Sequence, residues 1–392
     1  MKDLLVTASE LHGTVTPPPF KSEVIRFLIL AALSGTRPSS IISFSEENGD
    51  DINAAEGIET AFFSDCDAVI PVGDSAALLR LIAPIVLSRK GLAVFSVGGS
   101  LFRREIFGGY SDLGWEFSRY RESGEMLISV RGSVPHGRIT LDASESSQTA
   151  SGLLLCLAAV PGLSIKLTDP VSLPYIELTL KLLSEFGISV RLSEDGFYYA
   201  DRCVPALPES FCFQPDYSYA ANFAAANYLI GGDTFRPVVI NGGESAASQP
   251  DHAVHRLLPE SRVSVRNCPD LFPILCVCAL KKQEDTVITD IARLKTKESD
   301  RVLSTRRLIE SIGGSIYVFD DYAVIPGCEG KLCGGEVDSF GDHRIVMAAA
   351  VASLLCCEPV IIRGADAVKK SAPRFFSDFE RLGGTVHELI RE

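Results

Sequence analysis

Six segments of the chain repeat one pattern: a polar or charged residue, an apolar and alanine-rich stretch of helical length, a short turn and a β-branched run. A supersecondary unit that recurs in this way must stack on its neighbours to bury its apolar face. The starts of consecutive segments are 53, 73, 69, 54 and 73 residues apart, which predicts two halves of three units each. The six segments begin at Lys21, Asp74, Ser147, Asp216, Asp270 and His343.

The residues between these segments complete a larger unit. In residues 178–200, 305–325 and 375–390, apolar residues at helical spacing end at a glycine, a common C-terminal cap, and an alternating pattern follows. Each repeat is therefore predicted to be a βαβαββ unit of an α/β (α+β) fold. Residues 46–67 and 241–267 are too short for the corresponding segment, so two repeats are expected to be trimmed.

Length and composition fit two globular domains. The chain has 392 residues, of which 46% are hydrophobic and 22% charged, so each half can bury a full core. Prolines at 17–19 and at 215 stiffen extended chain and mark the expected crossings between the halves. The expected domains are a discontinuous C-terminal domain of residues 1–17 plus 216–392 and an N-terminal domain of residues 18–215.

Charge and targeting signals restrict the partners. The net charge of −13 argues against a nucleic-acid surface, so an anionic ligand must meet a local basic cluster. The N-terminus has no basic region followed by an apolar core, and the apolar stretches are shorter than the roughly 20 residues that span a bilayer. The sequence therefore predicts a cytoplasmic protein with no nucleic-acid and no membrane partner.

The eleven cysteines favour a structural role. Five of them (Cys156, Cys276, Cys278, Cys356 and Cys357) lie inside apolar helical stretches, and the others show no CxxC spacing. Small buried hydrophobic side chains in a reducing compartment are the favoured interpretation, and metal or redox chemistry is the alternative.

Basic clusters are the first candidates for anion binding. Lys21, Ser22 and Arg26 open the first segment, and residues 22 and 26 share a helix face, so a hydroxyl and a guanidinium can meet one ligand. Residues 297–301 are expected to place Lys297, Glu298 and Arg301 within one helical turn. The alternatives are a solvated helix start for the first cluster and a surface salt-bridge ladder for the second.

Further candidates lie at the starts of other apolar segments. Residues 342–344 (DHR) and 369–374 (KKSAPR) form a third basic cluster, of which a helix capped by Asp342 explains the first part. Residues 146–148 (SSQ) either cradle a phosphate or cap a helix. Asp270, which follows a proline, is either a cap or a general base.

Taken in order, these motifs resemble those of the 5-enolpyruvylshikimate-3-phosphate synthase family. They are KSEVIR, SSQTASGLL, SLPYIELTLKLL, PD at 269–270, KTKESDR, GDHR and KKSAP, and the resemblance spans residues 13–385. It implies two domains, each with three βαβαββ units in an inside-out α/β barrel, and an active site in the cleft between them. It also implies enolpyruvyl transfer from phosphoenolpyruvate to shikimate 3-phosphate, without metal or organic cofactor, by an expected monomer.

The resemblance assigns roles to residues at matching positions. Asp270 would remove the proton of the attacking hydroxyl, and Glu298 or Lys21 would transfer a proton at the enolpyruvyl methylene. Shikimate 3-phosphate would be bound by Lys21, Ser22, Arg26, Ser146, Ser147, Gln148, Ser172, Tyr175, Asp270 and Lys297. Phosphoenolpyruvate would be bound by Lys21, Arg104, Gln148, Arg301, Arg344 and Lys370, with Arg103 as the alternative to Arg104.

Several positions depart from the family pattern. Phe20 replaces a glycine before Lys21, and Arg293 stands where many relatives have asparagine. Asp74 replaces a neutral amide and is expected to weaken the binding of an anion. Ala76 replaces a glycine beside the phosphoenolpyruvate pocket, which predicts low sensitivity to the inhibitor glyphosate.

Two other functions stay open. The sister family that acts on UDP-N-acetylglucosamine has an asparagine after its first lysine and a cysteine in its mobile loop. Here Ser22 follows Lys21, and residues 99–112 contain no cysteine. A non-catalytic relative is the second alternative, because the loops of the first domain depart from the family pattern.

Overall fold

The computed structural model describes residues 2–7, 10–65, 68–201, 204–231 and 236–390. The chain forms two compact units: Met1–Pro19 with Gln214–Glu392, called here the discontinuous unit, and Phe20–Phe213, called the inserted unit. Each unit has its own hydrophobic core. In the discontinuous unit, Pro19 pairs antiparallel with Pro215, so the chain leaves this unit and returns to it at neighbouring points.

The six predicted helical segments are all helices that start within two residues of the expected positions. Four of them begin behind a polar side chain that accepts a backbone N–H of the first turn, which satisfies a donor with no partner inside the helix: Ser75, Ser146, Asp216 and Asp342. The helices are α1 (Lys21–Leu33), α4 (Ala76–Lys90), α6 (Ser147–Leu155), α8 (Tyr217–Ile230), α10 (Phe272–Ala279) and α12 (His343–Ala352).

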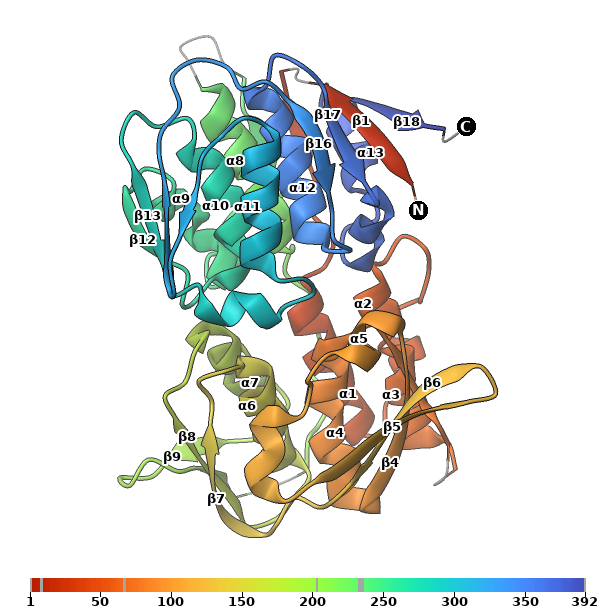
Figure 1. Ribbon diagram of the computed structural model, residues 1–392. Coiled ribbons are helices and arrows are strands. Elements are labelled where there is room, and N and C mark those ends of the chain that lie inside the picture. Colours follow the sequence, from red (N-terminus) through yellow and green to blue (C-terminus); the bar gives the residue numbers. More distant parts are fainter. Residues whose placement is uncertain (1, 8–9, 66–67, 202–203, 232–235, 391–392) are drawn as a thin grey trace. The chain divides into compact units, whose positions relative to one another are not determined.

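These helices lie at the centre of their units and the sheets lie outside them. In the discontinuous unit α8, α10 and α12 pack against one another, and in the inserted unit α4 packs against both α1 and α6 (Figure 1). These helices are hydrophobic nearly all round because each is covered by other elements on every side, so none of its faces needs to be polar.

Four sheets repeat one topology, in which the first two strands are parallel and the next two are antiparallel, in the order first, second, fourth, third. In the inserted unit these are β3 (Ile70–Gly73), β4 (Leu92–Val97), β6 (Glu125–Arg131) and β5 (Glu116–Glu122), and β7 (Gly137–Asp142), β8 (Leu163–Thr168), β10 (Tyr198–Ala200) and β9 (Val190–Leu192).

The discontinuous unit holds the other two four-stranded sheets. They are β12 (Arg262–Ser264), β13 (Thr286–Thr289), β15 (Tyr322–Ile325) and β14 (Tyr317–Val318), and β16 (Gly335–Asp338), β17 (Val360–Arg363), β1 (Asp3–Thr7) and β18 (Thr385–Leu389). In the last sheet the N-terminal strand β1 takes the fourth place of the repeat, between β17 and β18 (Figure 1).

Outer and short helices complete the units. The predicted helices that end at a glycine are α7 (Leu173–Glu185), α11 (Arg301–Ser311) and α13 (Phe375–Arg381). The remaining helices are α2 (Asp50–Asn53), α3 (Glu56–Phe63), α5 (Gly99–Arg103) and α9 (Val254–Leu257). Across the described ranges, no helix has both the length and the apolar character needed to cross a membrane.

The structure confirms, over the residues that it describes, that two of the six repeats are trimmed. Four copies are complete, and a fifth is reduced to β2 (Gly13–Val15) and β11 (Val238–Ile240), which pair in parallel. The β-branched run that ends the first segment, residues 39–44, was expected to form a strand, and this is wrong: Pro38 starts a 3-10 turn and a loop follows. Because α2 and α3 occupy the next residues instead of strands, an extended segment here has no partner for its backbone N–H and C=O groups.

The sheets around the internal helices are open. Each sheet in the described part of the chain has two edge strands, and none closes on itself. The mixed α/β, two-domain architecture with internal helices is confirmed, but it is built from open sheets.

Candidate active site

The predicted site residues fall into two clusters, one in each unit, and each is described within its own unit. The first, called the carboxylate–cation cluster, lies in the discontinuous unit and contains Asp251, Asp270, Lys297, Glu298, Arg301, Asp342, Arg344 and Lys370. The second, called the helix-start cluster, lies in the inserted unit and contains Lys21, Ser22, Arg26, Ser146, Ser147, Gln148, Ser172 and Tyr175.

Asp270 is held between two guanidinium groups. It lies in a 3-10 turn (Pro269–Leu271) directly before α10. Its Oδ1 accepts a hydrogen bond from Arg301 Nη1 at 2.6 Å, and its Oδ2 accepts one from Arg344 Nη2 at 2.9 Å. Burial alone would raise the pKa of this carboxyl, but Arg344 and Arg301 hold the pKa well below its ordinary value. Asp270 is therefore ionised across the physiological pH range.

Arg301 joins three carboxylates. It is the first residue of α11, and its side chain is only 1% exposed. Its Nε donates to Asp342 at 3.0 Å, its Nη1 to Asp270 and its Nη2 to Glu298 at 2.6 Å. Burial would lower the pKa of Arg301, but the carboxylates of Asp342, Glu298 and Asp270 raise it. Because all three nitrogens already bind protein carboxylates, Arg301 chiefly positions these carboxylates.

Lys297 and Glu298 precede α11 and do not share a helical turn with Arg301, so that expectation is wrong. A 3-10 helix (Ala292–Thr296) ends before Lys297, and Asp300 then caps α11 by accepting from the N–H of Leu303 at 3.0 Å. The cap fixes the helix start after the predicted turn.

The loop position of these two residues leaves their charged ends inside the cluster. Glu298 Oε1 lies 3.7 Å from Lys370 Nζ, which comes from a 3-10 helix (Ala365–Lys370) that follows β17. Burial lowers the pKa of Lys297 to about 8, with Asp270 opposing the shift. The loop thus places one carboxylate and one amine beside Asp270 and Arg301, and Lys370 adds a second amine beside Glu298.

Arg344 is fixed by both backbone and side-chain contacts. It is the second residue of α12, whose cap Asp342 accepts from the N–H of Arg344 at 2.9 Å. Its Nη1 donates to the carbonyl oxygen of Ser218 in α8 at 3.1 Å. The expected cap role of Asp342 is confirmed, and the same carboxylate also binds Arg301.

Asp251 is a member of the cluster that sequence reasoning missed. It is 1% exposed, accepts a hydrogen bond from the hydroxyl of Ser218, and lies near Asp270 and Arg344. Burial and the charge of Asp270 raise the pKa of Asp251 to about 7. A signal was present in the sequence, because three Pro–Asp dipeptides, at 215–216, 250–251 and 269–270, each supply an aspartate to this region.

Arg26 is the centre of the helix-start cluster. It is 2% exposed, and its three nitrogens donate to Thr179 Oγ1 at 2.8 Å, to the Ser22 carbonyl at 2.8 Å and to Ser151 Oγ at 3.1 Å. None of these partners in the described residues is a carboxylate, and burial lowers the pKa of Arg26 to about 10. A buried cation with only neutral partners favours the arrival of an anion.

The network of Arg26 brings together α1, α6 and α7. The hydroxyl oxygen of Thr179 lies 3.0 Å from the Tyr175 carbonyl oxygen and 2.9 Å from the Ser151 hydroxyl oxygen, so its one proton is shared between these two acceptors. Ser172, which begins α7, has φ 52° and is 2% exposed. A non-glycine residue in this left-handed region is strained, which is typical of functional positions.

Ser146–Gln148 form the start of α6. The Ser146 hydroxyl accepts the N–H of Gln148 at 3.2 Å, so it is a helix cap, and Ser147 is buried behind it. The Gln148 side-chain oxygen accepts from Arg80 Nη1 at 3.0 Å. Lys21 Nζ lies 2.8 Å from a carboxylate oxygen of Asp51 in α2, a partner that the sequence did not indicate.

Asp74 is used inside the protein. Its Oδ1 accepts from the N–H of Ser100 at 3.0 Å, from the Ser100 hydroxyl at 2.7 Å and from the N–H of Leu101 at 3.0 Å. It therefore caps the short helix α5 from outside, and a side chain at Gly98 would collide with its carboxylate. From the sequence, Asp74 was expected only to weaken the binding of an anion, and its capping of α5 was not predicted.

The other departures also have local contacts. The ring of Phe20 lies 6.4 Å from that of Tyr175, and Arg293 donates to the carbonyls of Val265 and Arg266. Arg104 follows α5, and its carbonyl accepts from Arg119 Nη2 at 2.7 Å.

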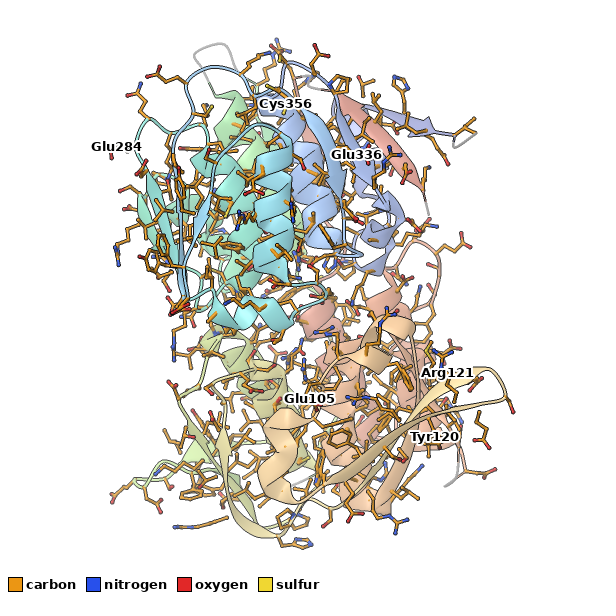
Figure 2. The ribbon with its side chains drawn as sticks, viewed as in Figure 1. Glu105, Tyr120, Arg121, Glu284, Glu336 and Cys356 are labelled. Atoms are coloured by element: carbon orange, nitrogen blue, oxygen red, sulfur yellow. The ribbon has the colours of Figure 1, made fainter. Side chains whose placement is uncertain are left out.

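Arg103 and Arg104 differ in exposure. Arg103 is exposed and Arg104 is half-buried, just before Glu105 (Figure 2). The choice between them as a ligand for phosphoenolpyruvate stays a prediction.

Among the residues with described positions, no group of three or more His, Cys, Asp or Glu side chains is arranged to hold a metal ion. Nine cysteines are described, all with free thiols, and Cys66 and Cys203 lie outside the described residues. Five of the nine are buried.

Solved structures share this fold. EPSP synthase from Acinetobacter baumannii superposes with a TM-score of 0.71 at 20% identity, and each chain is covered completely. The enolpyruvyl transferase NikO from Streptomyces tendae gives a TM-score of 0.68 at 13% identity, also over all of both chains. The fold is that of the enolpyruvyl transferases.

Sequence comparison identifies the family within this class. A family model described as EPSP synthase (3-phosphoshikimate 1-carboxyvinyltransferase) matches residues 42–247 and 238–379. The 3-phosphoshikimate 1-carboxyvinyltransferase of Clostridium perfringens strain SM101 is 30% identical over 99% of this chain and 100% of the relative. That of Clostridium acetobutylicum is 30% identical over 96% of both. The chain belongs to the EPSP synthase family.

Proposed function

We propose that the protein transfers the enolpyruvyl group of phosphoenolpyruvate to the 5-hydroxyl of shikimate 3-phosphate, which gives 5-enolpyruvylshikimate 3-phosphate and phosphate. Membership of the EPSP synthase family supports this reaction. The structural observation that carries it is the ionised Asp270 between Arg301 and Arg344, with Glu298 and Lys370 beside them.

The first step of the reaction needs a base and an acid. Asp270 accepts the proton of the 5-hydroxyl as its oxygen attacks C2 of phosphoenolpyruvate, and a proton is added at C3 of the methylene. Glu298 or Lys21 supplies that proton. In the second step the proton leaves C3 again, the C2–O bond to the phosphate group breaks, and phosphate is released.

Cations offset the repulsion between the two anionic substrates. Arg344 and Lys370 bind phosphoenolpyruvate, and Arg301 is included with them, although its three carboxylate partners make it chiefly a residue that positions Asp270 and Glu298. Arg104 and Gln148 are the proposed partners from the inserted unit. No metal or organic cofactor takes part in this proposal.

Shikimate 3-phosphate is bound by the helix-start cluster together with Asp270 and Lys297. The buried Arg26, which has neutral partners only, pairs with the shikimate carboxylate, and the hydroxyls of Ser146, Ser147 and Ser172 bind the phosphate. This assignment requires the two units to close around the substrates. Small-angle scattering tests it: the radius of gyration should fall when shikimate 3-phosphate and a phosphoenolpyruvate mimic are added together.

Phosphate release from shikimate 3-phosphate plus phosphoenolpyruvate is the test of the reaction. The wild-type protein should release phosphate only when both substrates are present. Release with UDP-N-acetylglucosamine in place of shikimate 3-phosphate would indicate the sister activity. No release by the folded protein with either acceptor would indicate a non-catalytic relative. We also propose that the protein acts as a cytoplasmic monomer, since its many free thiols suit a reducing compartment.

A further inference from the structure

Two cysteines of the discontinuous unit, Cys333 and Cys357, are 24 residues apart in the sequence but lie on two chain segments that run side by side. Leu332 and Cys356 form a parallel bridge just before β16 and β17 begin. The N–H of Cys357 donates to the Leu332 carbonyl at 2.8 Å, and the N–H of Glu358 donates to the Cys333 carbonyl at 3.2 Å. Cys333 and Cys357 therefore follow the bridged residues on adjacent chains.

Burial shows which way these side chains face. Leu332 and Cys356 are 3% and 1% exposed, whereas Cys333 and Cys357 are both exposed and both free thiols. The two exposed thiols therefore lie on the solvent side of this bridge, whereas the bridged side chains face the core. The Sγ of Cys357 donates to the Cys333 carbonyl at 3.8 Å, which agrees with this placement.

The backbone brings the two cysteines close together. Each directly follows a residue of the bridge Leu332–Cys356, where neighbouring chains lie about 5 Å apart, within the Cα separation of about 4.4–6.8 Å that disulfides span. The two segments are held closely, since a side chain at Gly334 would collide with the backbone of Glu358. A bond between Cys333 and Cys357 would therefore join two segments that already lie side by side.

The third thiol of this group does not compete. Cys356 is buried, and burial raises its pKa to about 11, so it stays protonated and inaccessible.

We propose that Cys333 and Cys357 are a reversible modification site that forms an intrachain disulfide when it meets a hydroperoxide. One thiolate attacks a peroxide oxygen, the O–O bond breaks, and a sulfenic acid and one molecule of water or alcohol form. The other thiolate then attacks the sulfenic sulfur, the S–S bond forms and water leaves. Two thiols lose two electrons and two protons in all, and the peroxide is reduced; two equivalents of a small thiol reverse the change.

The position of the pair suggests what the bond does. It would tie together the starts of β16 and β17, and these strands lead at their far ends to Asp342–Arg344 and to Lys370. Because the pairing exists before oxidation, the bond should hold the register of these strands without moving the cluster. The oxidised protein should keep its activity and unfold less readily in this region.

Peptide mapping of the intact protein under non-reducing conditions tests the site. After treatment with hydrogen peroxide, the wild type should give a linked peptide that joins Cys333 to Cys357, and dithiothreitol should remove the link. In Cys333→Ser the remaining Cys357 should carry sulfenic or sulfinic acid instead. Cys212→Ser, which removes an exposed thiol from the inserted unit, is the matched control and should leave the link intact.

A second measurement distinguishes a bond formed in the folded protein from one formed only after local unfolding. Amide exchange in residues 335–338 and 360–363 should be slower in the oxidised wild type than in the reduced protein, and unchanged by peroxide in Cys333→Ser. Sulfinic acid on both thiols, a link between two chains, or faster exchange after oxidation would overturn the proposal.

Discussion

The Nη1 atom of Arg301 donates to the Oδ1 atom of Asp270 at 2.6 Å, although the two residues lie on opposite sides of strand β13 in the sequence. The same guanidinium also binds Glu298 and Asp342. One buried arginine therefore sets the positions of the proposed base and of the proposed acid. This contact links the start of the inner helix α10 to the start of the outer helix α11 within one repeat.

The first prediction concerns Asp270. Asp270→Asn removes the proton acceptor but keeps the size of the side chain and one oxygen. We expect kcat to fall by roughly 10² or more, while the Kd of shikimate 3-phosphate changes by less than about tenfold. Steady-state kinetics and calorimetric titration measure the two quantities. Asp300→Asn, an exposed acid that can still cap α11, is the control, and near-normal turnover in Asp270→Asn would remove Asp270 from the mechanism.

The second prediction concerns the pH dependence of substrate capture. Burial lowers the pKa of Lys297 to about 8, so its ammonium group is lost as the pH rises through this value. Because the anionic substrate needs that charge, kcat/KM for shikimate 3-phosphate should fall above about pH 8. The pKa of Asp270 is held far lower, so it should contribute no acidic limb in the neutral range.

Variants at two lysines test this assignment. Lys297→Arg keeps its charge at high pH and should move the basic limb of the profile upward. Lys295→Arg changes an exposed lysine of the same segment and should leave the limb where it is. A wild-type profile that stays flat to pH 9.5, or a limb unmoved in Lys297→Arg, would be incompatible with a role for this ammonium.

The helices were the most predictable part of the fold, because each is an apolar stretch behind a polar cap and that pattern is local. The strand expected at residues 39–44 failed since a β-branched run forms a strand only when a partner strand exists, and here α2 and α3 follow. Whether a partner exists depends on residues far along the chain.

The candidate site shows the same division. Asp270, Arg301 and Arg344 could be found from their places at helix starts, and the structure brings them together. Asp251 was missed because its neighbours come from three separate segments, and only folding buries it beside Asp270. Likewise, the capping of α5 by Asp74 could not be predicted, because the N–H groups that it accepts belong to Ser100 and Leu101, which are distant in the sequence.

The third prediction concerns Asp251 and stability. Its pKa is raised to about 7 by burial and Asp270, whereas an aspartate in the unfolded chain titrates near pH 4. Arg344 and the Ser218 hydroxyl oppose the shift, and Asp216 adds to it. The folded state therefore binds more protons than the unfolded state between about pH 4 and 7, so this group's contribution to the free energy of unfolding falls as the pH rises across that window.

Asp251→Asn should remove this contribution, so the variant should gain stability relative to wild type from pH 4.5 to 7, by about 1–4 kcal/mol. The single tryptophan, Trp115, lies in the inserted unit, so its fluorescence would report on the wrong unit. Amide exchange of α8, whose Ser218 binds Asp251, is the suitable measurement. Asp300→Asn, with an exposed side chain, is the control. If the difference in the free energy of unfolding between variant and wild type is the same at pH 4.5 and at pH 7, Asp251 titrates normally.

The last prediction concerns glyphosate and Ala76. Ala76 is the first residue of α4, follows the cap Ser75 and is 7% exposed, so its methyl group is packed. The family resemblance places a glycine here against the phosphoenolpyruvate pocket, which glyphosate fills more fully than the substrate. An added methyl in a tight site costs about 1–3 kcal/mol, or roughly 5- to 150-fold in affinity, and this cost falls mainly on the larger ligand.

Ala76→Gly should therefore lower the inhibition constant of glyphosate several-fold more than it lowers the KM of phosphoenolpyruvate. Ala77→Gly, a change in the same helical turn, carries a similar cost to the helix and is the matched control. If Ala76→Gly is no more sensitive than Ala77→Gly, the methyl group of Ala76 does not face the inhibitor. Any low sensitivity found in the wild type would then need another cause, such as the Asp74 carboxylate that fixes the start of α5.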